Sequence, residues 1–444
     1  MSEKKNAKFG SRWGFVLAAV GSAVGMANVW GFPSKMAAGG GFAFLIPYFI
    51  FIALFSAVGL SAEFAVGRWA KTGTLGSYRK AFASRNKHIG IVGEIQGVLP
   101  LLGSLAIAIG YAVIISYILK ALFDSTTGTL MQVDIAGWFN SFSANSYSVV
   151  PYHVIVIAIT LVTLLLGAKS IEKTNKVMMP VFFLIFVGLA VWVYFLPGSE
   201  KGYALMFTPV WSKLLDVNVW ITAMGQAFFS LSVTGSGMLV YGAYLGDKES
   251  VVPLSVRTAI FDTIAALVAA LVVIPACAAF GLDDDMGGPG MLFVAMPSIM
   301  KNMGVFGQIL SIFLYVAMIF AGISSLQNMF EAVSESLLTR FPKLKRWLVL
   351  TVLGLVCFGV GVNMEAISSW GPWMDWVSIY IIPIGATIGA ISWFWIARKK
   401  DFMAQINLGA GKPVGGIWYG IGKYIYVPCA LILCLIALIT KTAF

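Results

Sequence analysis

The chain has 444 residues, of which 59% are hydrophobic and only 11% carry a charge, and its formal net charge is +11. Soluble globular domains carry about 25% charged residues, so this composition argues against a water-soluble fold and excludes a disordered chain. A polytopic membrane protein remains, and its positive charge follows if Lys and Arg are retained in cytoplasmic loops.

Eleven apolar segments follow one another along the chain. Each is near or above the ~20 residues needed to cross about 30 Å of hydrocarbon. We therefore expect an all-α polytopic membrane protein with about eleven transmembrane helices. The expected spans are residues 13–38, 42–69, 93–123, 151–168, 172–196, 217–244, 254–281, 303–338, 346–363, 374–397 and 416–440.

The distribution of Lys and Arg predicts which ends of these spans face the cytoplasm. With the N-terminus inside, the tail and alternate loops hold most of the positive charge, whereas the other side receives Asp124, Asp134 and Asp283–Asp285. This asymmetry is typical of the positive-inside rule. We expect a multi-pass protein of the cell (inner) membrane with a cytoplasmic N-terminus, and an odd number of spans then places Phe444 outside.

Two spans contain clusters of small and polar residues at their centres, Gly21–Asn28 in the first and Ser230–Gly237 in the sixth. Gly inside a helix costs about 1 kcal/mol relative to Ala, so these clusters favour unwinding. Unwound backbone survives in a membrane only where it lines a protein cavity or holds an ion. Each cluster alone fits close helix packing equally well. Their matching places, five spans apart, favour an inverted-repeat transporter with a midplane site.

Several polar side chains are expected at membrane depth, namely Asn28, Glu63, Asp262, Ser324, Ser325, Gln327, Asn328 and Glu331. Ionisable groups there cost about 2.5–3.5 kcal/mol on insertion scales, so a functional role is the first hypothesis. For Glu63 we favour a structural role, in which its carboxylate accepts freed backbone N–H groups. A Ser pair alone would indicate only a helix–helix hydrogen bond. Together with unwound carbonyls, however, these groups supply the oxygen ligands that suit sodium rather than a transition metal.

Cysteine and histidine give no sign of a metal centre or a hydrolase. The four cysteines lie in apolar runs without metal-ligand spacing and are interpreted as small buried hydrophobic residues. They are Cys277, Cys357, Cys429 and Cys434. Only two histidines occur, His88 and His153, and no pair of nucleophile and base is visible. We therefore expect a protein that is not an enzyme.

Five stretches resemble motifs of the neurotransmitter:sodium symporter family. They are GSAVGMANVWGFP (Gly21–Pro33), the glycines Gly39–Gly41, GQAFFSLS (Gly225–Ser232), AGISS (Ala321–Ser325) and SIEKTNKVMMP (Ser170–Pro180). The resemblance extends over nearly the whole chain and implies a prokaryotic, eleven-span member with the LeuT-type fold. Its two five-helix repeats would be residues 13–196 and 217–397, after a tail at 1–12 and before an additional eleventh helix at 416–440.

The resemblance implies a sodium-coupled symporter of amino acids that works by alternating access and binds two sodium ions. One sodium site would use the Ala23 carbonyl, Asn28, Ser230 and Asp262, together with the substrate carboxylate. The second would use the carbonyls of Gly21, Val24 and Ala321 and the hydroxyls of Ser324 and Ser325. The substrate would lie against Ala23, Gly25, Met26, Ile107, Tyr111, Phe229, Ser230, Ser232, Ser325 and Met329. Tyr111 would bind the substrate carboxylate, and Phe229 would act as a lid.

Two positions indicate what such a transporter would carry. Monoamine carriers of the family have an Asp where this chain has Gly25, so the substrate is expected to be a neutral, bulky L-amino acid with its own carboxylate. Gly235 or Thr234 falls where relatives with small aliphatic substrates carry Phe, which predicts room for Tyr, Phe or Trp. Leucine remains the alternative, and Asn328 nearby could favour a polar group. Asp262 supplies a negative charge beside sodium, so chloride is not required, and proton antiport is possible.

The chain departs from the family pattern at both gates. Gly31 occupies the place of the outer-gate arginine, so the acid Asp375 lacks its usual partner unless water or another cation substitutes. The inner-gate Arg and Trp align with Asn6 and Phe9. Ser170 replaces the Gly that, with a Pro after nine intervening residues (Pro180), would let the fifth span unwind.

Two other functions compete with this interpretation. A proton-coupled amino-acid carrier would use Asp262 or Glu63 as its titrating group. A channel-like membrane protein belongs to a different class and would need polar residues along one continuous path. The polar residues here gather at one depth, which favours a binding site over a pore.

Overall fold

The computed structural model describes residues 8–282 and 287–442, and every regular element within them is a helix. The predicted all-α fold class is therefore confirmed. Asn6 and the predicted acidic run Asp283–Asp285 lie outside the described residues.

The helices of the first half of the chain end at residue 194. They are α1 (Arg12–Ala23), α2 (Phe32–Ala38), α3 (Phe42–Leu54), α4 (Ser61–Ala70), α5 (Thr74–Arg85), α6 (Gly90–Gln96), α7 (Val98–Thr126), α8 (Thr129–Gln132), α9 (Ile135–Ser143), α10 (Val150–Leu164) and α11 (Ala168–Tyr194). The π-helical turns η1 (Ala27–Gly31) and η2 (Phe55–Leu60) join α2 and α4 to the helices before them.

The second half begins with a short helix and ends with an apolar one. Its helices are α12 (Ser199–Phe207), α13 (Val217–Ser230), α14 (Gly237–Ala243), α15 (Val251–Ala279), α16 (Gly288–Gly290), α17 (Met296–Lys301), α18 (Gly304–Arg340), α19 (Arg346–Gly361), α20 (Ile367–Trp376), α21 (Ile382–Ile391), α22 (Lys399–Asn407), α23 (Gly416–Ile421) and α24 (Val427–Thr440). The π-helical turn η8 (Val377–Ile381) joins α20 to α21.

Eight helical runs of the described chain are long and apolar enough to cross a membrane. The pair Arg12–Ala23 and Ala27–Ala38 makes a ninth span, bent by 59° at its break. α10 is apolar but has only 15 residues, and the segment predicted at 217–244 is divided between α13 and α14. The chain is therefore a multi-pass membrane protein, whereas the count of eleven spans remains a prediction.

The predicted start of the tenth span at residue 374 is wrong. α20 begins seven residues earlier, at Ile367, because the helix continues through Pro372 instead of starting after it. In contrast, α11 runs without a break from Ala168 past Ser170 and Pro180. The unwinding of the fifth span that the family pattern suggests is absent from this conformation of the described chain.

Both predicted helix breaks are present but shorter than the sequence clusters. α1 ends at Ala23, and Met26 already has helical φ and ψ angles of −60° and −33°, so only residues 24 and 25 leave the helix. The second break covers residues 231–236, where Ser232 and Gly235 have φ of +52° and +74°. Such a backbone suits Gly and is uncommon for Ser. These bends leave backbone groups unpaired by the helix and available to other partners.

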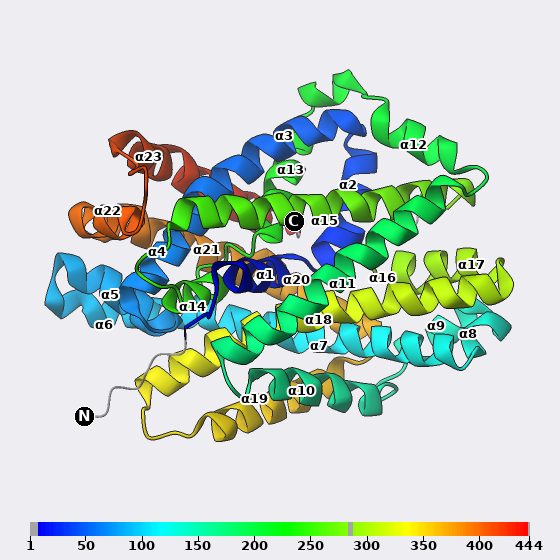
Figure 1. Cartoon of the computed structure of the whole chain (residues 1–444), viewed down its shortest axis with the longest axis horizontal. Coiled ribbons are helices and arrows are strands. Elements are labelled where there is room, and N and C mark those ends of the chain that lie inside the picture. The colour runs from blue at the N-terminus through cyan, green and yellow to red at the C-terminus, as the bar shows by residue number, and fades with distance from the viewer. Residues whose placement is uncertain (1–7, 283–286, 443–444) are drawn as a thin grey trace.

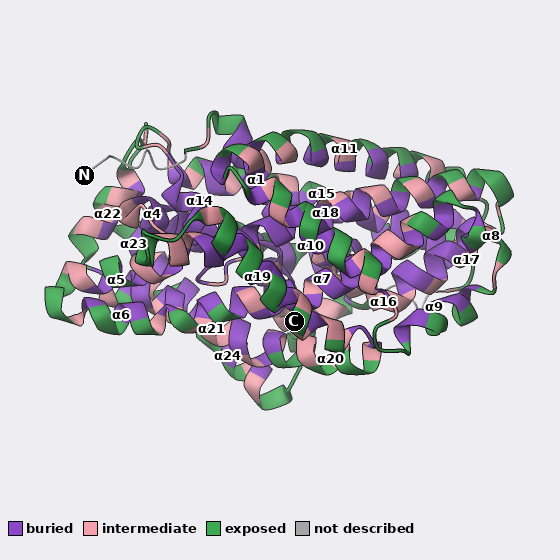
Figure 2. Cartoon of the chain, turned by 90° about the horizontal axis from the view of Figure 1, so that it is seen from below, coloured by how far each residue is buried: buried purple, intermediate pink, exposed green. Residues whose placement is uncertain are grey.

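The two broken helices lie at the centre of the molecule. α1 packs against α11, α15 and α18, and α14 packs against α4 and α18. In Figure 1 the long helices α7, α11, α15 and α18 run along the long axis, and shorter helices gather at both ends. Figure 2 shows exposed residues along the outer sides of the long helices. Leu184 of α11, Val305 of α18 and Ile439 of α24 are 74%, 76% and 78% exposed, as expected of side chains that face lipid.

Candidate binding site

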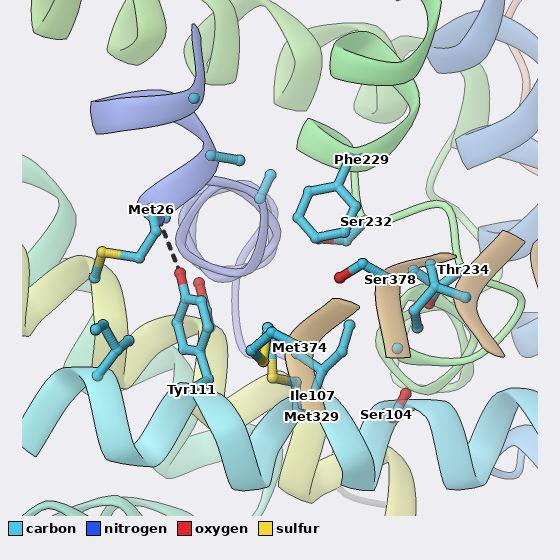
Figure 3. A pocket seen from close by; sticks show the side chains of 18 of the residues that line it. Met26, Ser104, Ile107, Tyr111, Phe229, Ser232, Thr234, Met329, Met374 and Ser378 are labelled. Atoms are coloured by element: carbon cyan, nitrogen blue, oxygen red, sulfur yellow. Dashed lines mark hydrogen bonds between the residues drawn. The ribbon is translucent and has the colours of Figure 1, made fainter. Parts of the chain in front are cut away.

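A cavity of about 310 Å³ opens beside both helix breaks. This volume lies at the lower end of the range for small-molecule sites. Its wall comes from α1, α7, α13, α18 and α20 and from both breaks (Figure 3). The lining residues are Ser22, Ala23, Gly25, Met26, Ala27, Trp30, Gly31, Lys35, Ser104, Ile107, Tyr111, Ile114, Gln226, Phe229, Ser232, Thr234, Gly237, Ser325, Asn328, Met329, Trp370, Gly371, Met374, Asp375, Ser378 and Ile382.

Asn28, Ser230 and Asp262 form one hydrogen-bonded cluster beside the first break. Asn28 Nδ2 donates to Asp262 Oδ1 at 2.8 Å and to Ser230 Oγ at 3.2 Å, and the Ser230 hydroxyl donates to Asp262 Oδ2 at 2.7 Å. Asn28 Oδ1 accepts the N–H of Gly25 at 3.0 Å. All three side chains are fully buried. The carboxylate therefore has neutral partners in the interior of the described chain, which is the setting that a cation would complete.

A second group of oxygen atoms lies where α18 passes the end of α1. Ser325 Oγ lies 3.2 Å from the carbonyl oxygen of Val24 and 3.4 Å from that of Gly21. Its neighbour Ser324 donates to the Ala321 carbonyl at 3.0 Å. Carbonyl and hydroxyl oxygens are the ligands that hard cations prefer. The five residues predicted for the second sodium site therefore lie at one place in the fold.

Tyr111 of α7 is tied to the first break. The Met26 N–H donates to Tyr111 Oη at 2.8 Å, as the dashed line in Figure 3 shows. Gly25 lies so close to this hydroxyl that a Cβ atom at Gly25 would approach Tyr111 Oη to 2.4 Å. A phenol hydroxyl that accepts one hydrogen bond can still donate another, so Tyr111 makes this end of the cavity suitable for an anionic group.

The middle of the cavity is apolar. Phe229 lies on one side of it, and Ile107, Met329 and Met374 lie on the other (Figure 3). Phe229 is the last residue but one of α13, so its ring sits next to the second break. Flexible Met side chains adapt to ligands of different shape. This region therefore suits a bulky apolar side chain.

Glu63 of α4 supports the second break. Its Oε1 accepts the N–H of Gly235 at 2.7 Å, and Oε2 has no hydrogen-bond partner in the described chain. The N–H of Gly235 is one of the groups that the break leaves without a helical partner. The predicted role of Glu63 in satisfying freed backbone is confirmed.

Lys35 and Asp375 lie at the mouth of the cavity. Lys35 Nζ donates to Gln226 Oε1 at 2.8 Å, and Gln226 Nε2 donates to the Ala27 carbonyl at 3.0 Å. Gly31, which replaces the expected arginine, lines the same mouth. Lys35 therefore provides a cationic side chain at the mouth, from a position four residues after Gly31.

The start of α1 is held at the opposite end of the molecule. Glu172 of α11 accepts hydrogen bonds from the Gly10 N–H and from the Ser11 hydroxyl, at 2.5 and 2.8 Å. Arg12 forms an ion pair with Glu249 at 2.7 Å. These contacts fix the segment before α1 to α11 and to the loop before α15, and the sequence motifs did not indicate them.

An aromatic contact and a second ion pair lie at the same end. The Phe9 ring packs edge-on against Tyr241 and Tyr244, with centroids 5.7 and 5.9 Å apart. Phe9 thus provides a large ring where the family pattern has a Trp. In the loop after α14, the hydrogen bond from Lys71 lowers the pKa of the Asp247 carboxyl from its ordinary value. Asp247 is therefore ionised at neutral pH.

Nine of the ten residues predicted to contact substrate line the cavity. The exception is Ser230, whose hydroxyl turns toward Asp262. Sequence reasoning assigned no role to Lys35, Glu172 or Ser378. Gln226 lies within a quoted motif, and its polarity inside an apolar span was the signal that could have identified it.

Comparisons with known proteins agree with this architecture. The model of the family described as "Sodium:neurotransmitter symporter family" matches residues 6–150 and 146–443. The uncharacterized sodium-dependent transporter YhdH of Bacillus subtilis is 28% identical over 464 positions, which cover 100% of both chains. An uncharacterized sodium-dependent transporter of Methanocaldococcus jannaschii is 28% identical over 443 positions, covering 94% of this chain and 87% of its own. The crystal structure of MhsT in complex with L-phenylalanine is similar, with a TM-score of 0.84 and 29% identity, covering 97% of this chain and 99% of MhsT.

Proposed function

The chain belongs to the sodium:neurotransmitter symporter family, and from this premise we propose that it couples sodium entry to the uptake of neutral hydrophobic or aromatic L-amino acids. It is a sodium-dependent, multi-pass transporter rather than an enzyme, with a LeuT-type fold. One observation supports this proposal most strongly: a single cavity combines three features. Two clusters of oxygen atoms and an end suited to an anion lie at the first helix break, and the middle of the cavity is apolar.

The first sodium ion would bind at the cluster of Asn28, Ser230 and Asp262, with the Ala23 carbonyl and the substrate carboxylate completing its shell. In the hydrogen-bonded arrangement, Asn28 and Ser230 donate to the Asp262 carboxylate. A bound cation would pair with the negative charge of Asp262 in place of these donors. The Asn28 and Ser230 side chains would then turn their oxygen atoms toward the cation. The burial of all three residues supports this, because an ion there would be desolvated and held strongly.

The second sodium ion would bind between α1 and α18. Its ligands would be the carbonyls of Gly21, Val24 and Ala321 and the hydroxyls of Ser324 and Ser325. The 3.2 and 3.4 Å contacts of Ser325 Oγ support this proposal, since they bring both elements into contact at these oxygens. Bound sodium would link the broken helix to α18 and so favour one conformation of the pair.

The substrate would place its carboxylate at Tyr111 and the backbone N–H groups of the first break. Gly25 leaves no side chain that could pair with a free amine, which argues against monoamines. The apolar middle between Phe229 and Met329 would take the side chain. L-Phenylalanine is bound in the crystal structure of MhsT, which supports an aromatic or hydrophobic substrate here.

Chloride would not be required, because Asp262 provides the negative charge near the first sodium ion. On the return step the desolvated carboxylate could take up a proton, giving proton antiport. We also propose that the N-terminus is cytoplasmic, that the protein resides in the inner membrane, and that residues 13–196 and 217–397 act as the two repeats. The mouth with Lys35 and Asp375 then faces outward, and the end with Glu172 faces the cytoplasm.

A competition assay tests the substrate class. Purified protein in liposomes takes up radiolabelled L-phenylalanine under an inward sodium gradient, and each of the other amino acids and tyramine is added in excess. Bulky neutral L-amino acids should compete, whereas tyramine and the acidic and basic amino acids should not. Replacing chloride by gluconate should leave uptake intact. Competition by tyramine would contradict the role of the carboxylate, and loss of uptake in gluconate would contradict chloride independence.

A further inference from the structure

The cavity has two polar ends. One is the Tyr111 hydroxyl with the Met26 N–H. The other lies beyond the apolar middle, where Ser104, Thr234 and Ser378 gather on the opposite side of the cavity (Figure 3). A purely hydrophobic substrate has no use for polar groups at that far end. The far end therefore suits a polar group on the substrate.

Two of these three hydroxyls have no side-chain partner within residues 8–282 and 287–442. Ser104 donates to Ser236 Oγ at 2.9 Å and is buried, so its hydrogen-bonding capacity is in use. The hydroxyls of Thr234 and Ser378 make no side-chain hydrogen bond in the described chain, and both residues are partly exposed to the cavity. They are the groups that a ligand at this end would have to satisfy.

Irregular backbone positions both hydroxyls. Thr234 lies in the second helix break, between Ser232 and Gly235 with their positive φ angles. Ser378 lies in the π-helical turn η8. Single π-helical turns inserted in α-helices occur frequently at functional sites. Two unrelated irregular segments thus bring one hydroxyl each to the same end of the cavity.

A ligand that covers these hydroxyls with carbon atoms alone would remove their water without replacing its hydrogen bonds, and this lowers the binding free energy gained. A short hydroxylated side chain, such as that of serine, would be separated from them by the apolar middle while its carboxylate is held at Tyr111. A rigid apolar side chain with a polar tip meets both requirements. A phenol ring is the natural side chain of this kind, because its hydroxyl both donates and accepts.

We propose that the far end of the cavity recognises the ring hydroxyl of a hydroxylated aromatic amino acid through Thr234 and Ser378, so that L-tyrosine is preferred over L-phenylalanine. This inference rests on the proposed function and narrows its substrate class. A site built to hydrogen-bond a substrate hydroxyl discriminates strongly against the analogue that lacks it.

The first experiment compares substrates that differ only at the ring tip. Sodium-driven uptake into proteoliposomes is measured with labelled L-tyrosine and L-phenylalanine, and O-methyl-L-tyrosine and L-leucine are added as competitors. L-Tyrosine should have the highest kcat/KM, by about 3- to 10-fold or more over L-phenylalanine. O-Methyl-L-tyrosine should compete less well than L-tyrosine because it cannot donate a hydrogen bond.

Two variants connect the preference to the hydroxyls. Thr234→Val and Ser378→Ala should each lower the kcat/KM for L-tyrosine about 3- to 10-fold, the effect of one hydrogen bond. Each should raise that for L-phenylalanine, since an unpaired hydroxyl no longer faces the ring. Thr387→Val is the matched control, because Thr387 donates to the Ala430 carbonyl at 3.1 Å, outside the cavity. It should keep the tyrosine preference.

The outcomes separate this inference from the function on which it rests. If no neutral amino acid drives or inhibits uptake, the proposed function is wrong. If L-phenylalanine or L-leucine is transported as well as L-tyrosine, the function stands and the inference is overturned. Equal losses for tyrosine and phenylalanine in both variants would also overturn it, because the hydroxyls would then have a structural role.

Discussion

Lys35 Nζ donates to Gln226 Oε1 at 2.8 Å and so joins α2 to α13 across the mouth of the cavity. α2 follows the first helix break, and α13 precedes the second. Gly31, at the position where the family has an arginine, lies beside this arrangement, and a Cβ atom there would be in ordinary contact with Gln226 Oε1, at 3.4 Å. Lys35 therefore supplies a positive charge at the same mouth as Asp375.

We predict that Lys35 helps to close the outer mouth after substrate binds. Lys35→Met should slow sodium-driven uptake roughly three- to tenfold, the scale of losing one hydrogen bond. Lys35→Arg should retain most of the activity, because an arginine also presents a cationic donor. Substrate binding to the detergent-solubilised protein should change less than uptake.

Lys201→Met provides the matched control for that comparison. Lys201 is exposed on α12 and does not line the cavity, so uptake should remain at the parental level. If Lys35→Met and Lys201→Met transport alike, Lys35 has no role in closing the mouth.

Ser324→Ala should weaken sodium dependence. The Ser324 hydroxyl lies at the proposed second sodium site and would be lost as a ligand, which should raise the sodium concentration at half-maximal substrate binding about tenfold, or ~1.4 kcal/mol. A scintillation proximity assay across a sodium titration measures this value. Ser311→Ala, a buried hydroxyl on the same helix α18 that lies outside the cavity, should leave the curve in place. Identical curves for Ser324→Ala and the parent would remove Ser324 from the site.

Gly25→Ala should impair substrate binding because its Cβ atom would lie 2.4 Å from Tyr111 Oη. Overpacking of this kind costs about 1–3 kcal/mol, which corresponds to a loss of roughly 5- to 150-fold in affinity. Gly188→Ala on α11 is the control, since a Cβ atom at Gly188 has no neighbour within 4 Å. Normal affinity in Gly25→Ala would show that Tyr111 moves without cost and that the fit at the polar end is loose.

Asp262→Asn should reveal how the first sodium ion is balanced. The change keeps the shape of the side chain but removes the negative charge, so uptake in gluconate should fall at least about tenfold. Added chloride should restore part of it if a mobile anion can replace the lost charge. Full uptake by Asp262→Asn in gluconate would show that this carboxylate does not balance sodium.

The fold was largely predictable because the chemistry of the bilayer is simple. Long apolar segments and their separating charges predicted the membrane class and most helix positions. The cluster Gly21–Asn28 is longer than the first break itself, because Gly21 and Asn28 keep helical backbone while residues 24 and 25 alone unwind. Composition shows where a helix is weak but not how many residues leave it, since tertiary packing decides that.

The sequence predicted those site residues that belong to family motifs. It did not predict those that reach the cavity only because the fold brings distant segments together. Ala23, Asn28 and Ser325 belong to recognisable motifs, and the structure brings them to the cavity region. Lys35 replaces an arginine from a different helical turn, and only the fold places it beside Gln226. Ser378 reaches the cavity from a π-helical turn, which no periodicity in the sequence indicates.

Sodium coupling at constant pH is the most direct test of the account. Proteoliposomes containing the protein are loaded with potassium buffer and diluted into sodium or potassium buffer of the same pH, with a protonophore present, and uptake of labelled L-tyrosine and L-phenylalanine is followed. We predict concentrative uptake in sodium buffer and none in potassium buffer. No uptake in either buffer, together with equal uptake in both once the protonophore is omitted and an inward proton gradient is imposed, would contradict sodium coupling and favour a proton-coupled carrier.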